Sequence, residues 1–164
     1  MDIYNSDWIN IDGNNIHKTA IIYSNVQLGT GNTIGAFCVI GSNGEIRGTK
    51  DFNGRVIIGD NNIISEMVTI QRPANETQRT AIGSNNLIMA HTHIGHDVTI
   101  GNNTELCTGT IVGGYAQIKD GAKIKLGVTI RNRIIIGERA LIGMGSVVVK
   151  NVESDSIVKG NPAK

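Results

Sequence analysis

An apolar side chain recurs at every sixth position along almost the whole chain. Stepping by six from Ile16 to Val148 visits 23 positions, of which 22 hold apolar residues and one holds Glu76. The residue two places before each of these positions is usually small, and the residue after is often glycine. This six-residue unit is the feature that most restricts how the chain can fold.

A period of six excludes the common repeating structures. A helix repeats its apolar positions about every 3.6 residues and a half-buried strand about every two, so neither produces a sustained six. A short strand followed by a corner fits the unit, with the aliphatic residue and the small residue pointing inward. Such a unit cannot bury a face alone, so successive units must stack on one another.

The repeat resembles that of the hexapeptide-repeat proteins with a left-handed parallel β-helix, over roughly residues 16–153. The resemblance implies that three units form one triangular coil, that residues 18 apart stack, and that the helix is left-handed. It predicts an all-β fold of about eight coils. We expect residues 1–15 to cap the first coil and residues 154–164 to form a C-terminal tail.

Two segments keep the phase of six but lose its composition. IRGTKDFNGRVI (46–57) and IQRPANETQRTA (70–81) carry charge, glycine and proline where a strand should lie, which predicts two external loops. They are either irregular coils without a role or walls of a substrate cleft, because loops on a rigid scaffold often carry binding residues.

Composition narrows the class of partner and the compartment. A formal net charge of +1 argues against nucleic acid or a charged membrane surface as a partner. The N-terminus has no basic region followed by an apolar run, and no stretch is long and apolar enough to span a bilayer. The two cysteines, Cys38 and Cys107, form no disulfide framework, so we expect a cytoplasmic protein.

Three of the four histidines lie in the run MAHTHIGHDV, at His91, His93 and His96. The register of the repeat turns all three outward. Taking every eighteenth residue, the outward face of His93 is mostly aliphatic, which predicts a subunit interface. Its predicted members are Ile21, Val39, Ile57, Asn75, His93, Ile111, Thr129 and Val147. An extra unit in either loop would move the upstream members to another face.

Clustered imidazoles can bind a metal ion or act as a base. The hexapeptide-repeat carbonic anhydrases bind metal through an H-x4-H pair and a third histidine 36 residues earlier. His91 and His96 have the pair spacing, but the third position holds Arg55, which cannot ligate. We therefore expect no metal, although solvated surface histidines stay possible.

Acyl transfer is the competing chemistry. A hydroxyl or amine that attacks a thioester must lose a proton, and a histidine can accept it near neutral pH. Gly114 follows His96 by eighteen residues, so stacking places its backbone beside His96, where an N–H can stabilise an oxyanion. Asp97 follows His96 and can orient its ring.

The run NNLIMAHTHIGHDVTIGNN resembles the active-site run of the bacterial UDP-N-acetylglucosamine acyltransferases. The resemblance implies that His96 is the general base, that Gly114 is the oxyanion donor, and that His93 positions the acceptor. His91, Tyr115, Gln71 and Arg72 are the further acceptor-binding candidates. An acidic residue after His96 also resembles the sialic-acid and bacillosamine acetyltransferases, which use acetyl-CoA.

The chain departs from the lipid A enzymes at several positions. Tyr115, Arg131 and Gln71 stand where those enzymes have histidines, and Lys164 ends the sequence where they continue into a helical domain. The ending IGMGSVVVKNVESDSIVKGNPAK resembles small acetyl-CoA-dependent sugar acetyltransferases. The acyl-CoA-binding candidates, against solvated lysines as the alternative, are Gly114, Arg131, Asn132, Lys150 and Lys164.

The sequence therefore predicts a cytoplasmic homotrimeric acyltransferase with a histidine base at a subunit interface. The favoured reaction moves acetyl from acetyl-CoA to an amine or hydroxyl of a nucleotide-linked sugar. The first alternative is an acyl-carrier-protein-dependent UDP-N-acetylglucosamine O-acyltransferase. A metal-dependent carbonic-anhydrase-like enzyme and a non-catalytic β-helix protein are the others.

Overall fold

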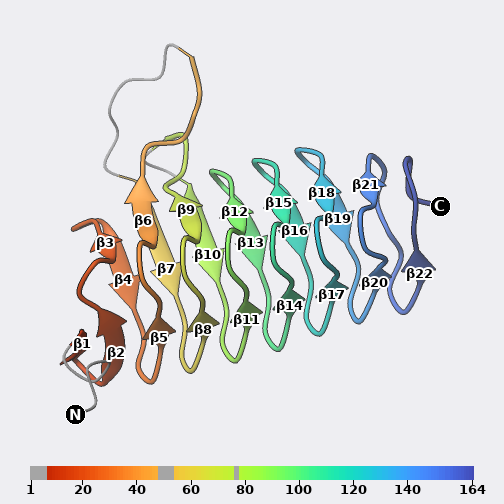
Figure 1. The fold of residues 1–164 in the computed structure, drawn as a ribbon. Helices are drawn as coiled ribbons and strands as arrows, with labels where there is room; N and C mark the ends of the chain where they lie inside the picture. Colours follow the sequence, from red (N-terminus) through yellow and green to blue (C-terminus); the bar gives the residue numbers. More distant parts are fainter. Residues whose placement is uncertain (1–6, 48–53, 76–77) are drawn as a thin grey trace.

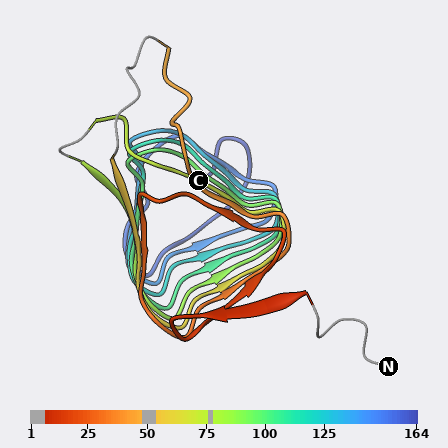
Figure 2. The same cartoon turned by 90° about the vertical axis from the view of Figure 1, so that its left-hand side faces the viewer.

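The computed structural model describes residues 7–47, 54–75 and 78–164. Within them the chain winds as a left-handed parallel β-helix with three sheets on its sides, which confirms the predicted all-β fold (Figure 1). Viewed along the helix axis, the coils superpose as a triangle (Figure 2). No helix within these ranges is long and apolar enough to cross a membrane.

Each sheet collects one strand from each coil. Sheet 1 contains β1 (Trp8–Ile11), β2 (Asn14–His17), β5 (Thr33–Ile34), β8 (Ile63–Ile64), β11 (Leu87–Ile88), β14 (Glu105–Leu106), β17 (Lys123–Ile124), β20 (Leu141–Ile142) and β22 (Ile157–Val158). Sheet 2 contains β3 (Ile21–Ile22), β6 (Val39–Ser42), β9 (Thr69–Gln71), β12 (His93–Ile94), β15 (Ile111–Val112), β18 (Thr129–Ile130) and β21 (Val147–Val148). Sheet 3 contains β4 (Val26–Leu28), β7 (Arg55–Ile58), β10 (Arg79–Ile82), β13 (Thr99–Ile100), β16 (Gln117–Ile118) and β19 (Ile135–Ile136).

The six-residue aliphatic positions fill the interior of the prism. Ile34, Ile64 and Ile88 stack in sheet 1, and from the second coil onward the equivalent residues of sheets 2 and 3 are likewise buried. Ile22 and Leu28 of the first coil are half-buried. Burial of these side chains is the main driving force for folding. Ile46 is the exception among the described positions, because it lies half-buried in a loop outside the prism. Phe52 and Glu76 lie outside the described residues.

Two loops leave the prism between sheets 2 and 3, on adjacent coils (Figures 1 and 2). Loop 1, described at residues 43–47 and 54, lies between β6 and β7, and loop 2, described at residues 72–75 and 78, lies between β9 and β10. The predicted ranges 46–57 and 70–81 overlap these loops but extend into the strands around them. Residues 55–57, 70–71 and 79–81 belong to strands.

Both loops insert multiples of six residues, which changes the predicted composition of His93's face. Ile58 follows Ile40 by 18 residues and Ile82 follows Ile70 by 12, where a regular corner takes six. The two insertions together add as many residues as one full coil. Ile21 and Val39, which precede both loops, therefore still lie on sheet 2 with His93. The prediction that Ile57 and Asn75 share this face is wrong, because Ile57 lies in sheet 3, Asn75 lies in loop 2, and Thr69 pairs with His93.

The two ends of the helix differ from a regular coil. At the N-terminus β1 pairs antiparallel with β2, with Trp8 opposite His17. At the C-terminus Val152 pairs with Ile136 and Ile157 with Leu141, each 16 residues apart, so the last coil is two residues shorter. The parallel pairing thus continues beyond residue 153 into the expected tail.

Candidate active site

His96 lies at the corner between sheets 2 and 3, directly after β12. Its Nδ1 lies 2.8 Å from Oδ2 of Asp97. Because an ionised carboxylate only accepts hydrogen bonds, Nδ1 carries the proton and Nε2 is left with a free lone pair. The side chain of His96 is 14% exposed and that of Asp97 only 3%. The pair therefore has a buried acid and an imidazole edge that a ligand can reach.

Gly114 lies against the free edge of the imidazole. A Cβ at this position would stand 2.5 Å from both Cε1 and Nε2 of His96, so only glycine fits beside the ring. The N–H of Tyr115 donates to the carbonyl oxygen of His96 at 2.9 Å, which fixes the two corners one above the other. The predicted proximity of Gly114 and His96 is what the structure shows.

The N–H of Gly114 has no acceptor among the described residues. At the corner between sheets 3 and 1, the equivalent N–H groups donate to a side-chain oxygen of the next coil. They belong to Thr30, Asp60, Ser84 and Asn102, at distances of 2.7 to 2.9 Å. An N–H that is left free beside Nε2 is suited to receive a developing oxyanion.

Tyr115 packs edge-on against the imidazole, with ring centroids 5.0 Å apart. The guanidinium of Arg133 lies 4.3 Å from the centroid of the Tyr115 ring, a cation–π contact. Arg131 was the arginine predicted to lie at the site, and Arg133 was not predicted. The signal was available, since Arg133 follows Tyr115 by eighteen residues and therefore stacks on it.

His93 points outward from sheet 2, next to the His96 corner. Its Nδ1 lies 2.8 Å from Oγ1 of Thr69 in the coil before it. Burial lowers the pKa of His93, the carboxylate of Glu45 raises it, and the nearby His96 lowers it further. The net direction is downward, so His93 is neutral near pH 7 and its ring serves as a hydrogen-bonding group.

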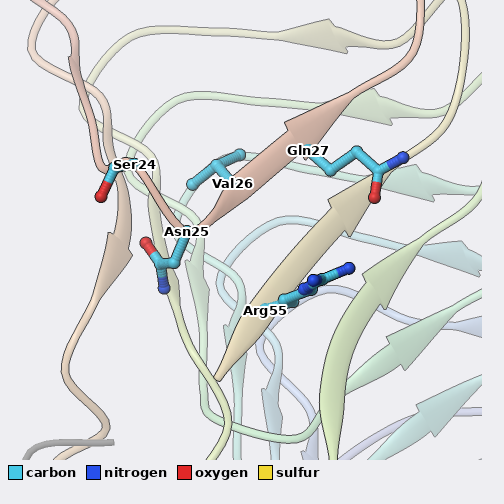
Figure 3. A pocket seen from close by; sticks show the side chains of 5 residues that line it. All are labelled: Ser24, Asn25, Val26, Gln27 and Arg55. Carbon is cyan, nitrogen blue, oxygen red and sulfur yellow. The ribbon is translucent and has the colours of Figure 1, made fainter. Parts of the chain in front are cut away.

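His91 lies at another corner, between sheets 1 and 2. It is exposed, and its N–H donates to the carbonyl oxygen of Glu66. Among the described residues no three histidine, cysteine or acidic side chains gather as a metal site. Arg55, which stands at the third position of the anhydrase pattern, lines a hollow of about 280 Å³ beside sheet 3 with Gln27 and Asn25 (Figure 3).

A cleft of about 600 Å³ opens where loop 1 meets the end of β9. It is lined by Tyr23, Ser42, Asn43, Glu45, Gln71 and Arg72. Gly44 packs on His96, since a Cβ there would lie 2.9 Å from Cβ of His96. The structure thus brings the predicted Gln71 and Arg72 together with Glu45, which the sequence analysis missed because nothing in the repeat places a loop residue.

Of the predicted donor-binding residues, Gly114 is buried against His96, whereas Arg131, Asn132, Lys150 and Lys164 are exposed and lie toward the C-terminal coils. Arg131 and Asn132 follow β18 at the same corner as His96, and Lys150 follows β21. Lys164 exchanges two backbone hydrogen bonds with Lys159. No contact among the described residues joins these side chains to His96.

Comparison with known proteins shows which sequences the chain is similar to. Residues 79–114 match the family described as bacterial transferase hexapeptide (six repeats). The chain is 39% identical over 111 residues to an acyl-[acyl-carrier-protein]–UDP-N-acetylglucosamine O-acyltransferase of Pseudomonas paraeruginosa, covering 67% of this chain and 43% of the relative. The chain spans about half the length of the curated relatives it matches.

Two solved structures resemble this chain over nearly its whole length, at different levels of sequence identity. The Arabidopsis UDP-N-acetylglucosamine acyltransferase superposes with a TM-score of 0.85 at 28% identity, over 93% of this chain and 61% of that one. The acetyltransferase domain of PglB from Neisseria gonorrhoeae superposes with a TM-score of 0.59 at 19% identity, over 92% and 56%. At that identity the second similarity concerns the fold alone.

Proposed function

This chain is a hexapeptide-repeat protein of the left-handed β-helix type, and on that basis we propose that it is an acyltransferase with His96 as its general base. The observation that carries the proposal is the arrangement around one imidazole. Asp97 holds the proton on Nδ1, and the Nε2 edge faces a glycine whose N–H is free. A base and an oxyanion donor side by side are the two groups that acyl transfer from a thioester needs.

In the proposed reaction, Nε2 of His96 takes the proton of an acceptor hydroxyl or amine as that group attacks the thioester carbonyl. The carbonyl oxygen becomes an oxyanion, which the N–H of Gly114 stabilises. When the intermediate collapses, the C–S bond breaks and the imidazolium returns the proton to the leaving thiolate. Asp97 stays ionised and stabilises the imidazolium, in the way that a buried carboxylate supports a catalytic histidine elsewhere.

The proposed acceptor is a UDP-linked amino sugar of the N-acetylglucosamine type. The named relatives act on UDP-N-acetylglucosamine, and the cleft between loop 1 and the end of β9 has the groups that sugar hydroxyls bind. Gln71 and the two charges of Glu45 and Arg72 provide donors and acceptors there, and neutral His93 lies within the electrostatic influence of Glu45. His91 lies at the opposite corner of sheet 2 from His96, so we leave it out of the proposed acceptor site.

The proposed donor is an acyl thioester carried by acyl-carrier protein. This reverses the order of donors that the sequence favoured, because the relatives at 34% to 39% identity are named for that donor. Acetyl-CoA is the second candidate, favoured by the resemblance of residues 142–164 to small acetyltransferases. Arg131, Asn132, Lys150 and Lys164 are the side chains proposed to meet its phosphates.

We also propose that the protein is a homotrimer with its active sites between subunits. Exposed large apolar side chains gather on sheet 2 and on the corner that joins sheets 1 and 2. They are Ile21, Phe37, Met67, Ile111, Leu126 and Met144. An apolar stripe of this kind on the outside of a rod is typical of a contact surface, and it borders His93.

Thiol release tests the proposal. The protein is incubated with acetyl-CoA or with acyl-carrier-protein thioesters of graded chain length, each with UDP-N-acetylglucosamine or its 3-amino analogue. Release of thiol that depends on the sugar supports an acyltransferase, and the thioester that reacts identifies the donor. No sugar-dependent release with any donor contradicts the proposal.

A further inference from the structure

Asp97, the carboxylate that accepts from His96, is bound by a hydroxyl in the preceding coil. The N–H of Asp97 donates to Oγ1 of Thr80 at 2.9 Å, and Thr80 lies in β10 with no solvent exposure. Asp97 has a φ of 60°, in the left-handed region that costs a non-glycine residue energy. The hydroxyl of Thr80 therefore fixes the backbone from which both Asp97 and the adjacent His96 project.

The carboxylate of Asp97 is held by loop 2. Its Oδ2 accepts from Nδ1 of His96 at 2.8 Å and also from the backbone N–H of Ala74 at 2.9 Å. Its Oδ1 is buried and has no partner among the described residues. One oxygen thus makes both hydrogen bonds, and any rotation of the carboxylate breaks the bond to Ala74 as well as the bond to His96.

Loop 2 is itself braced. A Cβ at Gly54, where loop 1 returns to the prism, would stand 2.5 Å from Cγ of Pro73, so the two loops touch immediately before Ala74. The position of the Ala74 N–H is thereby set by the packing of both loops rather than by Asp97 alone. A buried carboxylate with an unpaired oxygen is costly and calls for a specific reason.

We propose that Thr80 and the Ala74 N–H of loop 2 are positioning groups that impose the Nδ1–H tautomer and the orientation of His96. They touch neither the acceptor nor the donor and act through Asp97. The inference rests on the proposed role of His96 as base for its effect on catalysis. The tautomer itself is a property of the folded chain that does not depend on any reaction.

The test uses the full chain with 15N-labelled histidine. Long-range 1H–15N correlation spectra, recorded where the imidazole is neutral, show which ring nitrogen carries the proton, and loss of a signal in His96→Gln assigns it. Thr80→Val removes the hydroxyl that accepts from the N–H of Asp97 and keeps the shape of the side chain. Ala74→Pro removes the loop 2 N–H that donates to Oδ2 of Asp97. Thr80→Ser restores a hydroxyl. Thr110→Val is the matched control, because Thr110 is equally buried and its hydroxyl donates only to the backbone oxygen of Cys107.

We expect the wild type, Thr80→Ser and Thr110→Val to hold the proton of His96 on Nδ1. Thr80→Val and Ala74→Pro populate the Nε2–H form and lower kcat about tenfold, with KM within about twofold, because only the support of the base is lost. If either variant keeps both the wild-type tautomer and the wild-type kcat, the positioning role is wrong for that group. If the wild type turns over no thioester, the proposed function fails, and the spectra still decide whether Thr80 and Ala74 set the tautomer.

Discussion

At the scale of single residues, the proposed catalysis depends on how closely the imidazole of His96 and the backbone of Gly114 approach each other. The glycine is needed for space, since the imidazole edge occupies the volume of any side chain at this position. A base that is fixed against a backbone N–H keeps the two catalytic groups at one distance throughout the reaction, which is the benefit of preorganisation.

Gly114→Ala tests this approach. The new methyl group would overlap Cε1 and Nε2 of His96, so the ring must turn away and lose its alignment. We expect kcat to fall about 100-fold, within the range that a general base contributes, while the far-UV circular dichroism keeps the wild-type shape. Wild-type turnover in a folded Gly114→Ala protein would show that the edge of His96 does not face the reaction.

His93 gives the fold a pH dependence. Burial holds the pKa of His93 below that of a free histidine, so the unfolded chain binds the proton first as the pH falls through about 6.5. Protonation therefore favours unfolding. The contribution of unprotonated His93 to the free energy of unfolding is fully present above about pH 6.5. It is lost as the pH falls through the pKa that His93 has in the folded protein.

We expect the free energy of unfolding of the wild type to decrease in this window more steeply than that of His93→Asn. Asn keeps a partner for Thr69 but has no proton to bind. Urea unfolding at a series of pH values measures both slopes. Equal slopes would mean that His93 does not carry the dependence.

At the scale of elements, a ladder of buried asparagines runs along the corner before sheet 1. Asn14, Asn32, Asn62 and Asn86 stack on successive coils, each accepting a backbone N–H of the next through its side-chain oxygen. Their amide groups donate to glycine carbonyls in the adjacent corner. The ladder satisfies backbone groups that the tight corner would leave unpaired.

Asn62→Ala breaks the ladder at its centre. It leaves the N–H of Asn86 and the carbonyl of Gly83 without their partners in a buried corner. We expect a loss of about 3 kcal/mol in the free energy of unfolding, measured by urea denaturation. The control Asn10→Ala, on the exposed face of β1, should change it by less than about 0.5 kcal/mol. Similar losses for the two variants would contradict the role of the ladder.

The elements also show where sequence reasoning succeeds and where it stops. The repeat predicts a stacked core, because one aliphatic residue per six must point inward, and the resemblance to the hexapeptide-repeat proteins adds its three sides. It does not reveal the length of the loops, since both insertions are multiples of six and leave the phase unbroken. For this reason Ile57 and Asn75 were assigned to the wrong face. The asparagine ladder was missed because the small-residue position was read as apolar or small only.

Some residues of the candidate site could be predicted from the sequence and others could not. His96, Asp97 and Gly114 were predictable, because adjacency and a spacing of eighteen place them together once the coil is known. Glu45 and Ala74 were not, because both lie in the loops. Thr80 lies 17 residues before Asp97 with no insertion between them, so its contact follows from the regular register once the coil is known. Contacts that cross a loop of unknown length have no fixed spacing in the sequence.

At the scale of the whole molecule, the exposed apolar side chains on sheet 2 and on the corner that joins sheets 1 and 2 predict assembly. Ile111 is 47% exposed at the centre of this face, beside His93. Ile111→Glu places a charge there, and we expect the variant to sediment as a monomer and to lose activity while His96 and Gly114 stay intact.

The matched control is Ile63→Glu, on sheet 1, where the side chain is 52% exposed. The same change on this face should leave a trimer with wild-type activity. A monomeric wild type, or loss of the trimer in Ile63→Glu alone, would mean that sheet 2 is not the interface.

The most direct test of the account is the dependence of acyl transfer on the imidazole of His96. Transfer of an acyl group from a thioester to UDP-N-acetylglucosamine or its 3-amino analogue is measured for the wild type and for His96→Gln, by mass spectrometry of the acylated sugar. The account predicts acylated product from the wild type and a fall in kcat of about 10²- to 10⁴-fold in the variant, with the fold unchanged. Equal rates for the two proteins would contradict it.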